Sequence, residues 1–301
     1  MSSEVREHIE EHANALNPNH EQRSYSRGQV ILLRIVATVS WLVLVVTSIY
    51  YAFEKPHEGQ YKRRKIWNQN WAHHTPFALN AIIVSIYWIV LYILQIPYIA
   101  SLYSADLASE TLTTACNLAS TFTYHNLLQF GFIHLWCRSY FGWALLLQIV
   151  NFFNLTFAYF KYPKTTKLTH IAVVAAPLAW TFVSLYWTGA VAVHAKHLAA
   201  RIVANVFVWT WLVYGYFYLI VFKDWALGFS LSVLSAALGV AQFLTVIVAV
   251  QWIEAFIIMA LLFLGSLAIA VPGIFGKDPF KRADGAGGDR EREPLLGGEN
   301  A

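Results

Sequence analysis

The stretch TYHNLLQFGFIHLWCRSYFGWALLLQIVNFFNLTFAYF, residues 123–160, carries polar groups inside two long apolar runs. The two runs meet at Cys137-Arg138-Ser139, which predicts a turn between two helices. Amide and imidazole groups are costly in hydrocarbon unless they have partners, so they must face other helices or a hydrated cavity. We therefore expect a membrane hairpin whose polar side chains point into a helical bundle.

The composition of the whole chain favours a membrane protein. Of its 301 residues, 57% are hydrophobic and 13% are charged, whereas about 25% are charged in an ordinary soluble domain. The net charge of +4 is small, and Lys and Arg lie in short clusters between apolar runs, so nucleic acid is not an expected partner. The two cysteines form neither a disulfide framework nor a paired metal motif.

The apolar runs divide into eight spans, because one helix needs only about 20 residues to cross a bilayer. The polar cluster His194-Ala195-Lys196-His197 must hold one turn, and a second turn must divide residues 225–271. Thr75-Pro76 is typical of a helix start, and Pro97 predicts a kink. The expected spans are residues 30–53, 77–102, 114–136, 140–160, 171–193, 198–222, 225–244 and 249–271. The predicted fold class is all-α: a polytopic integral membrane protein whose helical bundle has about eight transmembrane spans over residues 30–272.

Polar segments flank the membrane domain, at residues 1–29 and in a tail over residues 273–301 that we expect to be disordered. Eight spans put both termini on one side. The Lys and Arg residues outside the spans favour cytosolic termini, although the basic cluster at residues 62–65 opposes this orientation.

The tail contains Glu291-Arg292-Glu293-Pro294-Leu295-Leu296, which resembles an acidic dileucine sorting signal. Such a signal predicts that a cytosolic sorting adaptor binds Glu291, Leu295 and Leu296 and directs the protein to the vacuolar membrane of the endomembrane system. The alternative is a solvated, charged tail end without a partner.

Two polar stripes are the candidate site. His125, Asn126 and Gln129 fall within about 100° on one predicted helix, and Gln148, Asn151 and Asn154 fall within about 120° on the next. If the stripes face each other, they form either a hydrated pocket or permeation path between spans three to six, or structural hydrogen bonds worth about 0.6 kcal/mol each.

Two further residues, Arg201 and Asn205, lie four apart on one face at the start of span six, and Glu254 begins span eight. An Arg and a Glu that reach inward can form a proton or anion relay. The alternative is that these long side chains snorkel to the membrane surface.

We expect no metal and no cofactor. His134 lies on the opposite side of its helix from His125, so the two cannot bind one ion, and His194 and His197 lack a third ligand nearby. The sequence contains no nucleophile elbow, Walker loop, HExxH helix or pair of aspartates, which indicates that the protein is not an enzyme.

Five runs stand out in the sequence: HTPFALN at 74–80, SIYW at 85–88, IVNFFNLT at 149–156, PLAWT at 177–181 and ARIVANVF at 200–207. These runs resemble a fungal family of multi-span membrane proteins known only as a domain of unknown function. The resemblance covers about residues 30–277 and implies no activity.

The 12 Trp residues, the run at 177–180 and the run at 205–209 carry a fainter similarity to the tryptophan-rich sensory proteins, relatives of the translocator protein. This similarity implies a tetrapyrrole or sterol ligand between helices.

The leading functional hypothesis is a non-enzymatic protein that binds or moves a small amphipathic or apolar molecule in a cavity within the membrane. A second hypothesis is a structural or trafficking protein that acts through its tail and the basic loop over residues 54–75. A third is a proton-coupled transporter that uses Arg201 or Glu254. The lipid bilayer is the one partner that all three hypotheses require.

Overall fold

The computed structural model describes residues 25–104, 109–162, 166–195, 198–245 and 250–274. In these ranges all regular secondary structure is helical and there is no strand, which confirms the predicted all-α class. The helices are α2 (Arg27–Phe53), α3 (Ile66–Ala72), α4 (Ala81–Leu102), α5 (Glu110–Cys137), α6 (Phe141–Lys161), α7 (Lys167–Thr169), the π-helix η1 (His170–Ala175), α8 (Ala176–Ala192), α9 (Leu198–Phe207), α10 (Trp209–Val221), α11 (Trp225–Thr245) and α12 (Gln251–Ile274).

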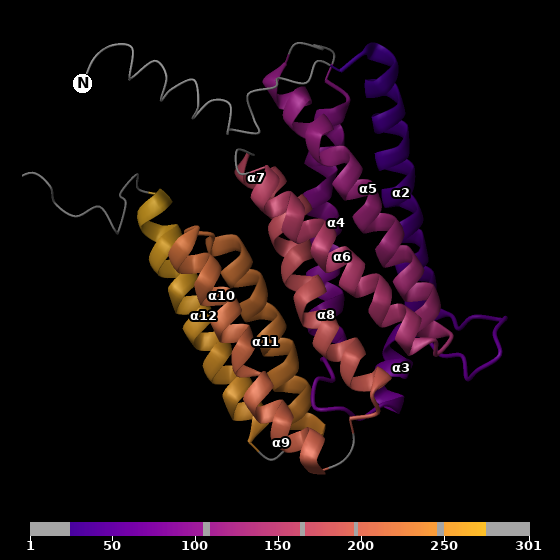
Figure 1. The fold of residues 1–301 in the computed structure, drawn as a ribbon, viewed down its shortest axis with the longest axis vertical. Helices are drawn as coiled ribbons and strands as arrows, with labels where there is room; N and C mark the ends of the chain where they lie inside the picture. Colours follow the sequence, from indigo (N-terminus) through magenta and orange to yellow (C-terminus); the bar gives the residue numbers. More distant parts are fainter. Residues whose placement is uncertain (1–24, 105–108, 163–165, 196–197, 246–249, 275–301) are drawn as a thin grey trace, which may run out of the picture.

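The described helices form long rods that run alternately up and down the bundle (Figure 1). The described ranges contain seven helical stretches that are long and apolar enough to cross a membrane. Five are single helices, and two join several elements: residues 167–192 (α7, η1 and α8) and residues 199–221 (α9 and α10). The remaining long helix, α5, has 28 residues but also carries polar side chains along its length, which lower its hydropathy. α2 begins and α12 ends at the same end of the bundle, as an even number of passes requires (Figure 1).

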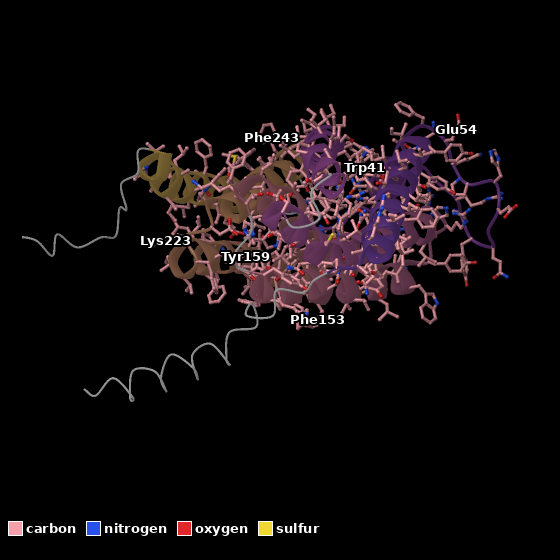
Figure 2. All side chains as sticks on the ribbon, turned by 90° about the horizontal axis from the view of Figure 1, so that it is seen from above. Trp41, Glu54, Phe153, Tyr159, Lys223 and Phe243 are labelled. Atoms are coloured by element: carbon pink, nitrogen blue, oxygen red, sulfur yellow. The ribbon has the colours of Figure 1, made fainter. Side chains whose placement is uncertain are left out.

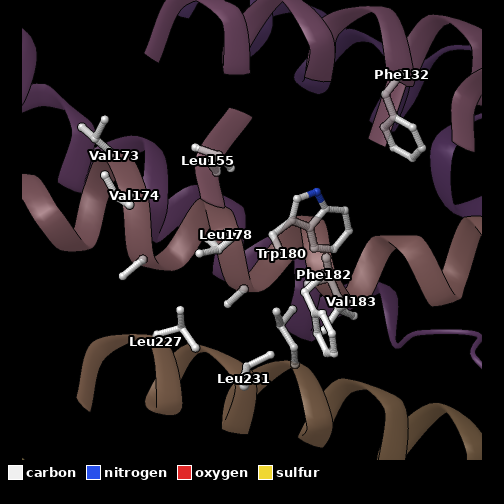
Figure 3. Packing of buried hydrophobic residues seen from close by; sticks show 14 of the residues in the cluster. Phe132, Leu155, Val173, Val174, Leu178, Trp180, Phe182, Val183, Leu227 and Leu231 are labelled. Carbon is white, nitrogen blue, oxygen red and sulfur yellow. The ribbon is translucent and has the colours of Figure 1, made fainter. Parts of the chain in front are cut away.

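The rods form two groups that meet along α8 and α11 (Figure 1). α2, α4, α5, α6 and α8 make one group, and α9 to α12 make the other. Most of α8 is buried: Leu178 and Val183 are fully buried, and α8 packs against α6 and α11 around them (Figure 3). By contrast, the outer faces of α2, α4 and α12 expose many Ile, Leu and Val side chains, as expected for a surface in contact with lipid.

Some helix boundaries differ from the expected ones. The chain does not begin a helix at Thr75-Pro76; α4 begins at Ala81, where the Asn80 side chain caps the N–H groups of Ile82 and Ile83. Residues 75–79 pack instead as a buried non-helical segment, because Asn80 N–H bonds the Ala237 carbonyl in α11. A local start signal is therefore overruled by a contact with a distant helix. The expected basic loop also contains the short helix α3.

A proline explains the π-helix at the start of α8. Pro177 has no N–H, and its ring displaces the carbonyl four residues earlier, so the preceding turn widens. The Ala176 N–H then bonds the carbonyl of Ile171, five residues back. From α4, Gln95 Nε2 donates to the Ala172 carbonyl at 3.1 Å. The Gln95 side chain thus provides a hydrogen bond to this carbonyl that water cannot provide within the bilayer.

Arg34 is a charged residue inside the first span, and the structure accounts for it. Its Nε donates to the Leu102 carbonyl, and its Nη2 donates to the Ser104 carbonyl at 2.7 Å. The Leu102 carbonyl ends α4 and has no partner within that helix, and Ser104 lies two residues beyond it. Arg34 thus caps α4 from α2 and gains compensation for its charge.

Candidate functional site

The two predicted polar stripes face each other in the hairpin of α5 and α6. His125 Nδ1 lies 3.1 Å from Asn151 Oδ1, and Gln148 Nε2 donates to Gln129 Oε1 at 2.9 Å. Asn154 lies on the same side and donates to the Thr121 carbonyl at 3.2 Å. The stripes therefore bond to one another, which is the arrangement expected of structural hydrogen bonds.

Asn126 extends this network to α2, where its Nδ2 lies 3.3 Å from Ser40 Oγ. Four buried atoms of the network have no protein partner among the described residues: His125 Nε2, Asn126 Oδ1, Gln148 Oε1 and Asn151 Nδ2. Buried polar atoms of this kind are normally satisfied by one or more internal waters. The network is thus a polar core of the membrane bundle.

A cavity lies beside this network, and spans four and six, which we expected to help enclose the ligand cavity, do not line it. It encloses about 400 Å³, and its walls come from α2, α3, α4, α5 and α8, which correspond to spans one, two, three and five and the short helix α3. This volume falls within the usual range of small-molecule sites, about 300–1,000 Å³. The lining residues are Val45, Ser48, Ile49, Ala52, Phe53, Ile66, Trp67, Val84, Ser85, Trp88, Ile89, Tyr92, Ile93, Gln129, Phe132, Ile133, Trp136, Trp180 and Trp187.

The inner wall of this aromatic pocket is made of tryptophans from four helices: Trp67, Trp88, Trp136, Trp180 and Trp187. Trp136 and Trp187 lie with their ring centroids 4.2 Å apart. Hydrogen bonds fix three of these rings: Trp67 Nε1 donates to Ser85, Trp136 Nε1 to the Ile66 carbonyl and Trp187 Nε1 to Asn70 Oδ1. These three rings are therefore held in place by the protein itself.

The outer edge of the aromatic pocket faces the lipid. Ile49 and Phe53 of α2 and Ile89 and Ile93 of α4 line the pocket, and each exposes more than half of its surface. Two hydrogen bonds join α2 and α4: Trp41 Nε1 donates to Gln95 Oε1, and the hydroxyls of Ser48 and Tyr92, two pocket-lining residues, bond to each other. Through the exposed side chains of α2 and α4, the pocket reaches the outer surface of the bundle.

Most predicted site residues lie outside this pocket. Of the eight interior residues proposed from the sequence, Gln129 alone lines it. His125 lies behind the wall, with its ring parallel to Trp88. Arg201 is exposed on the outer face of α9, and Asn205 on the same helix has a buried Oδ1 without a partner. Arg201 and Glu254 therefore form no ion pair among the described residues.

A second polar cluster, which the sequence did not indicate, joins the two groups of helices. His170 Nε2 lies 2.9 Å from Asp224 Oδ2, and Asp224 Oδ1 caps α11 by accepting from the N–H groups of Ala226 and Leu227. Burial alone would raise the pKa of Asp224, but the hydrogen bond and charge of His170, with the backbone N–H of Leu227 and the Tyr159 hydroxyl, lower it below its ordinary value. Asp224 is therefore a carboxylate at neutral pH.

Metal ligands do not gather in the part of the chain that the structure describes: it holds no group of three or more His, Cys, Asp or Glu side chains placed to bind an ion. Cys116 and Cys137 are both buried as free thiols. The residues of the dileucine-like signal, Glu291, Leu295 and Leu296, lie outside the described residues.

These features define an integral membrane protein of the polytopic helical class. Residues 201–296 match the model of a family described as a fungal protein of unknown function (DUF1774), which confirms the resemblance to a fungal domain of unknown function over that part of the chain. The match covers α10 to α12 and most of α9, whereas the aromatic pocket lies wholly before it. No curated protein and no solved structure matches the chain. The similarity to tryptophan-rich sensory proteins is not shown by these comparisons.

Proposed function

We propose that this protein binds a small apolar or amphipathic molecule, taken from the bilayer, in the aromatic pocket, and that it does so without chemical conversion. The observation that carries the proposal is the pocket itself: an inner wall of tryptophan rings, three of them fixed by hydrogen bonds, and an opening toward lipid between α2 and α4. Pockets of this size with apolar walls and a few polar groups are the usual binding sites for small molecules.

The bilayer limits where the binding energy comes from. Lipid chains are as apolar as the pocket walls, so moving a ligand from lipid into the pocket gains little hydrophobic free energy. Selectivity must then arise from close contact with the aromatic rings and from hydrogen bonds. Gln129 and Ser48 are polar side chains on the wall that can make such bonds.

The proposal is tested by photo-cross-linking in reconstituted membranes. The probes are a sterol and a long-chain fatty alcohol, each carrying a diazirine group. We expect cross-links to map by mass spectrometry to pocket residues on α2 and α4. Ala52→Phe, which places a ring in the pocket from a half-buried position, should lower labelling several-fold.

The matched control is Ala270→Phe, at another half-buried position on α12 away from the pocket. It should leave labelling unchanged. If both probes label only the outer faces of the helices, or if Ala52→Phe labels as well as the wild type, the pocket is not a binding site and the proposal is wrong.

For the location of the protein, we propose the vacuolar membrane, with both termini in the cytosol and a sorting adaptor bound at Glu291, Leu295 and Leu296. α2 begins and α12 ends at the same end of the bundle, which supports placing both termini on the same side of the membrane (Figure 1). The test compares fluorescently tagged wild type with the Leu295→Ala/Leu296→Ala variant in fungal cells, with protease protection of the tail. Vacuolar signal that the variant retains, or a protected tail, would contradict this proposal.

A purely structural or trafficking role is the alternative function, and the same variant separates it from ligand binding. A trafficking role predicts that the tail variant loses all function, whereas Ala52→Phe has no effect in cells. The proposed binding function predicts that, in the reconstituted protein, Ala52→Phe loses ligand binding and the tail variant keeps it.

A further inference from the structure

The segment between α2 and α3 is strongly basic and lies at one end of the aromatic pocket. Residues 54–65, EKPHEGQYKRRK, contain five Lys or Arg side chains and two Glu. A shallow hollow in this segment, the basic hollow, is lined by Lys55, Gln60, Tyr61, Lys62, Arg63 and Arg64. Seen along the bundle, the segment that follows Glu54 projects outward on the side away from α12 (Figure 2).

The basic hollow and the aromatic pocket are lined by residues that lie close together in the sequence. Phe53 lines the pocket and Lys55 lines the hollow; Ile66 lines the pocket and Arg64 lines the hollow. Two residues of chain span at most about 7 Å. The two sites therefore adjoin at both ends of the segment, within the length of one amphiphilic molecule.

Hydrogen bonds hold the basic segment against the rest of the bundle. The Arg64 N–H donates to the Cys137 carbonyl at 3.0 Å, and Ser139 Oγ donates to the Lys62 carbonyl at 2.5 Å. Gln69 Nε2 in α3 donates to Ser139 Oγ at 2.6 Å. These bonds involve the turn between α5 and α6, so the backbone of Lys62 and Arg64 has a defined position against the bundle.

Two of the cations remain free to bind a ligand. Arg63 donates to the His57 carbonyl and Arg64 Nη1 donates to Gln69 Oε1, so both guanidinium groups have partners in the protein. Lys55 and Lys62 are exposed, and neither side chain has a hydrogen bond or ion pair with a described residue. An ammonium group in this position attracts an oxyanion at the membrane surface.

We infer that the ligand of the aromatic pocket is an anionic amphiphile: its apolar part lies among the tryptophans, and its carboxylate or phosphate lies in the basic hollow, bound by Lys55 and Lys62. This inference rests on the proposed function and adds the chemical class of the ligand. Charge complementarity with the hollow selects the headgroup, which the apolar pocket alone cannot do.

The test uses matched pairs of photoreactive lipids that share one diazirine-bearing chain. One pair is a fatty acid and its fatty alcohol; the other is lysophosphatidate and lysophosphatidylcholine. In reconstituted wild-type protein we expect at least one anionic member to label pocket residues several-fold more strongly than its uncharged or zwitterionic partner. The pair that shows the preference tells whether the headgroup is a carboxylate or a phosphate.

The variant Lys55→Gln/Lys62→Gln should remove this preference and leave labelling by the uncharged or zwitterionic probes unchanged. Its matched control is Lys161→Gln/Lys167→Gln, at the opposite end of the bundle, where α6 ends and α7 begins (Figure 1). The control should keep the preference. Added salt should reduce the preference in the wild type, because the cations are exposed and therefore screened.

Each remaining outcome overturns a stated claim. Equal labelling of the pocket by both members of each pair refutes the anionic ligand but leaves the proposed binding function intact. A preference for anionic probes that persists in Ala52→Phe shows general attraction of lipid to the loop and also refutes the inference. Absence of pocket labelling by all four probes counts against the proposed function itself.

Discussion

The indole ring of Trp88 lies parallel to the imidazole ring of His125, with 6.4 Å between the ring centroids and 6° between the ring planes. Trp88 lines the aromatic pocket, whereas His125 belongs to the polar network between α5 and α6. The pair thus marks the boundary between the apolar cavity and the polar core. The two regions lie side by side: one is the proposed binding site, and the other joins helices by hydrogen bonds.

Apart from Gln129, which also lines the pocket, the polar network should matter for stability and not for ligand binding. Asn151→Ala removes the partner of His125 Nδ1, and we expect it to destabilise the bundle by about 1–2 kcal/mol, since a buried polar group is left unpaired. Thermal unfolding in detergent measures this change. Probe labelling of the pocket at low temperature should be unaffected. Lost labelling with unchanged stability would instead make Asn151 part of the binding site.

Arg34 should be needed for the packing of α2 against α4. Arg34→Gln loses the charge-assisted hydrogen bonds to the carbonyls of Leu102 and Ser104, so we expect the free energy of unfolding to fall by about 1.5–3 kcal/mol. Arg27→Gln, at an exposed position at the start of α2, is the control and should change the apparent Tm little. Equal Tm values for the two variants would show that the capping bonds do not contribute.

The His170–Asp224 pair predicts a loss of stability in acid. The pKa of Asp224 is lowered in the folded state, so its contribution is complete above the unfolded-state pKa of about 3.9 and is lost as the pH falls through the folded-state value. We expect the apparent Tm of the wild type to fall below about pH 4. Asp224→Asn can keep the cap on Ala226 and Leu227 but lacks the charge, so its deficit against the wild type should shrink as the pH falls. A deficit that stays constant from pH 7 to pH 3 would contradict this linkage.

Close helix packing in the second group depends on glycine. A Cβ atom added to Gly228 of α11 would lie 2.7 Å from both Leu219 Cδ2 and Ser266 Oγ, which is closer than a Cβ atom approaches other heavy atoms in proteins. We therefore expect Gly228→Ala to cost about 1–3 kcal/mol through overpacking. Gly142→Ala is the matched control, because no atom lies within 4 Å of its added Cβ, and it should be neutral or slightly stabilising. Similar melting temperatures for both variants would mean that α10 and α12 move apart at no cost.

The sequence predicted the class of fold because membrane spans are recognised locally. Each apolar run carries its own signal of length and hydropathy, and a helix satisfies its backbone hydrogen bonds without help from other segments. The pairing of the polar stripes was also accessible, since residues 123–160 form one hairpin with a short turn. Helix periodicity then determines which side chains share a face.

The position of the pocket was not accessible in this way. Its walls come from residues as far apart as Val45 and Trp187, and none of them carries a signal that tells a pocket tryptophan from one at the membrane surface. The pairing of His170 with Asp224 likewise joins residues 54 apart in the chain. Even the start of α4 depends on the hydrogen bond from the Asn80 N–H to the Ala237 carbonyl, and no helix begins at Thr75-Pro76 as the local sequence predicted.

The amino-acid sequence by itself thus determined that the chain is an all-helical membrane protein, roughly where its spans lie and which polar side chains face inward on neighbouring helices. These properties depend on hydropathy and helix period, which act over one or two turns. Only the tertiary structure decided where the cavity lies, which rings line it and that the basic segment lies beside it. Those properties depend on how non-neighbouring helices pack, and packing is set by the shapes of side chains from the whole bundle.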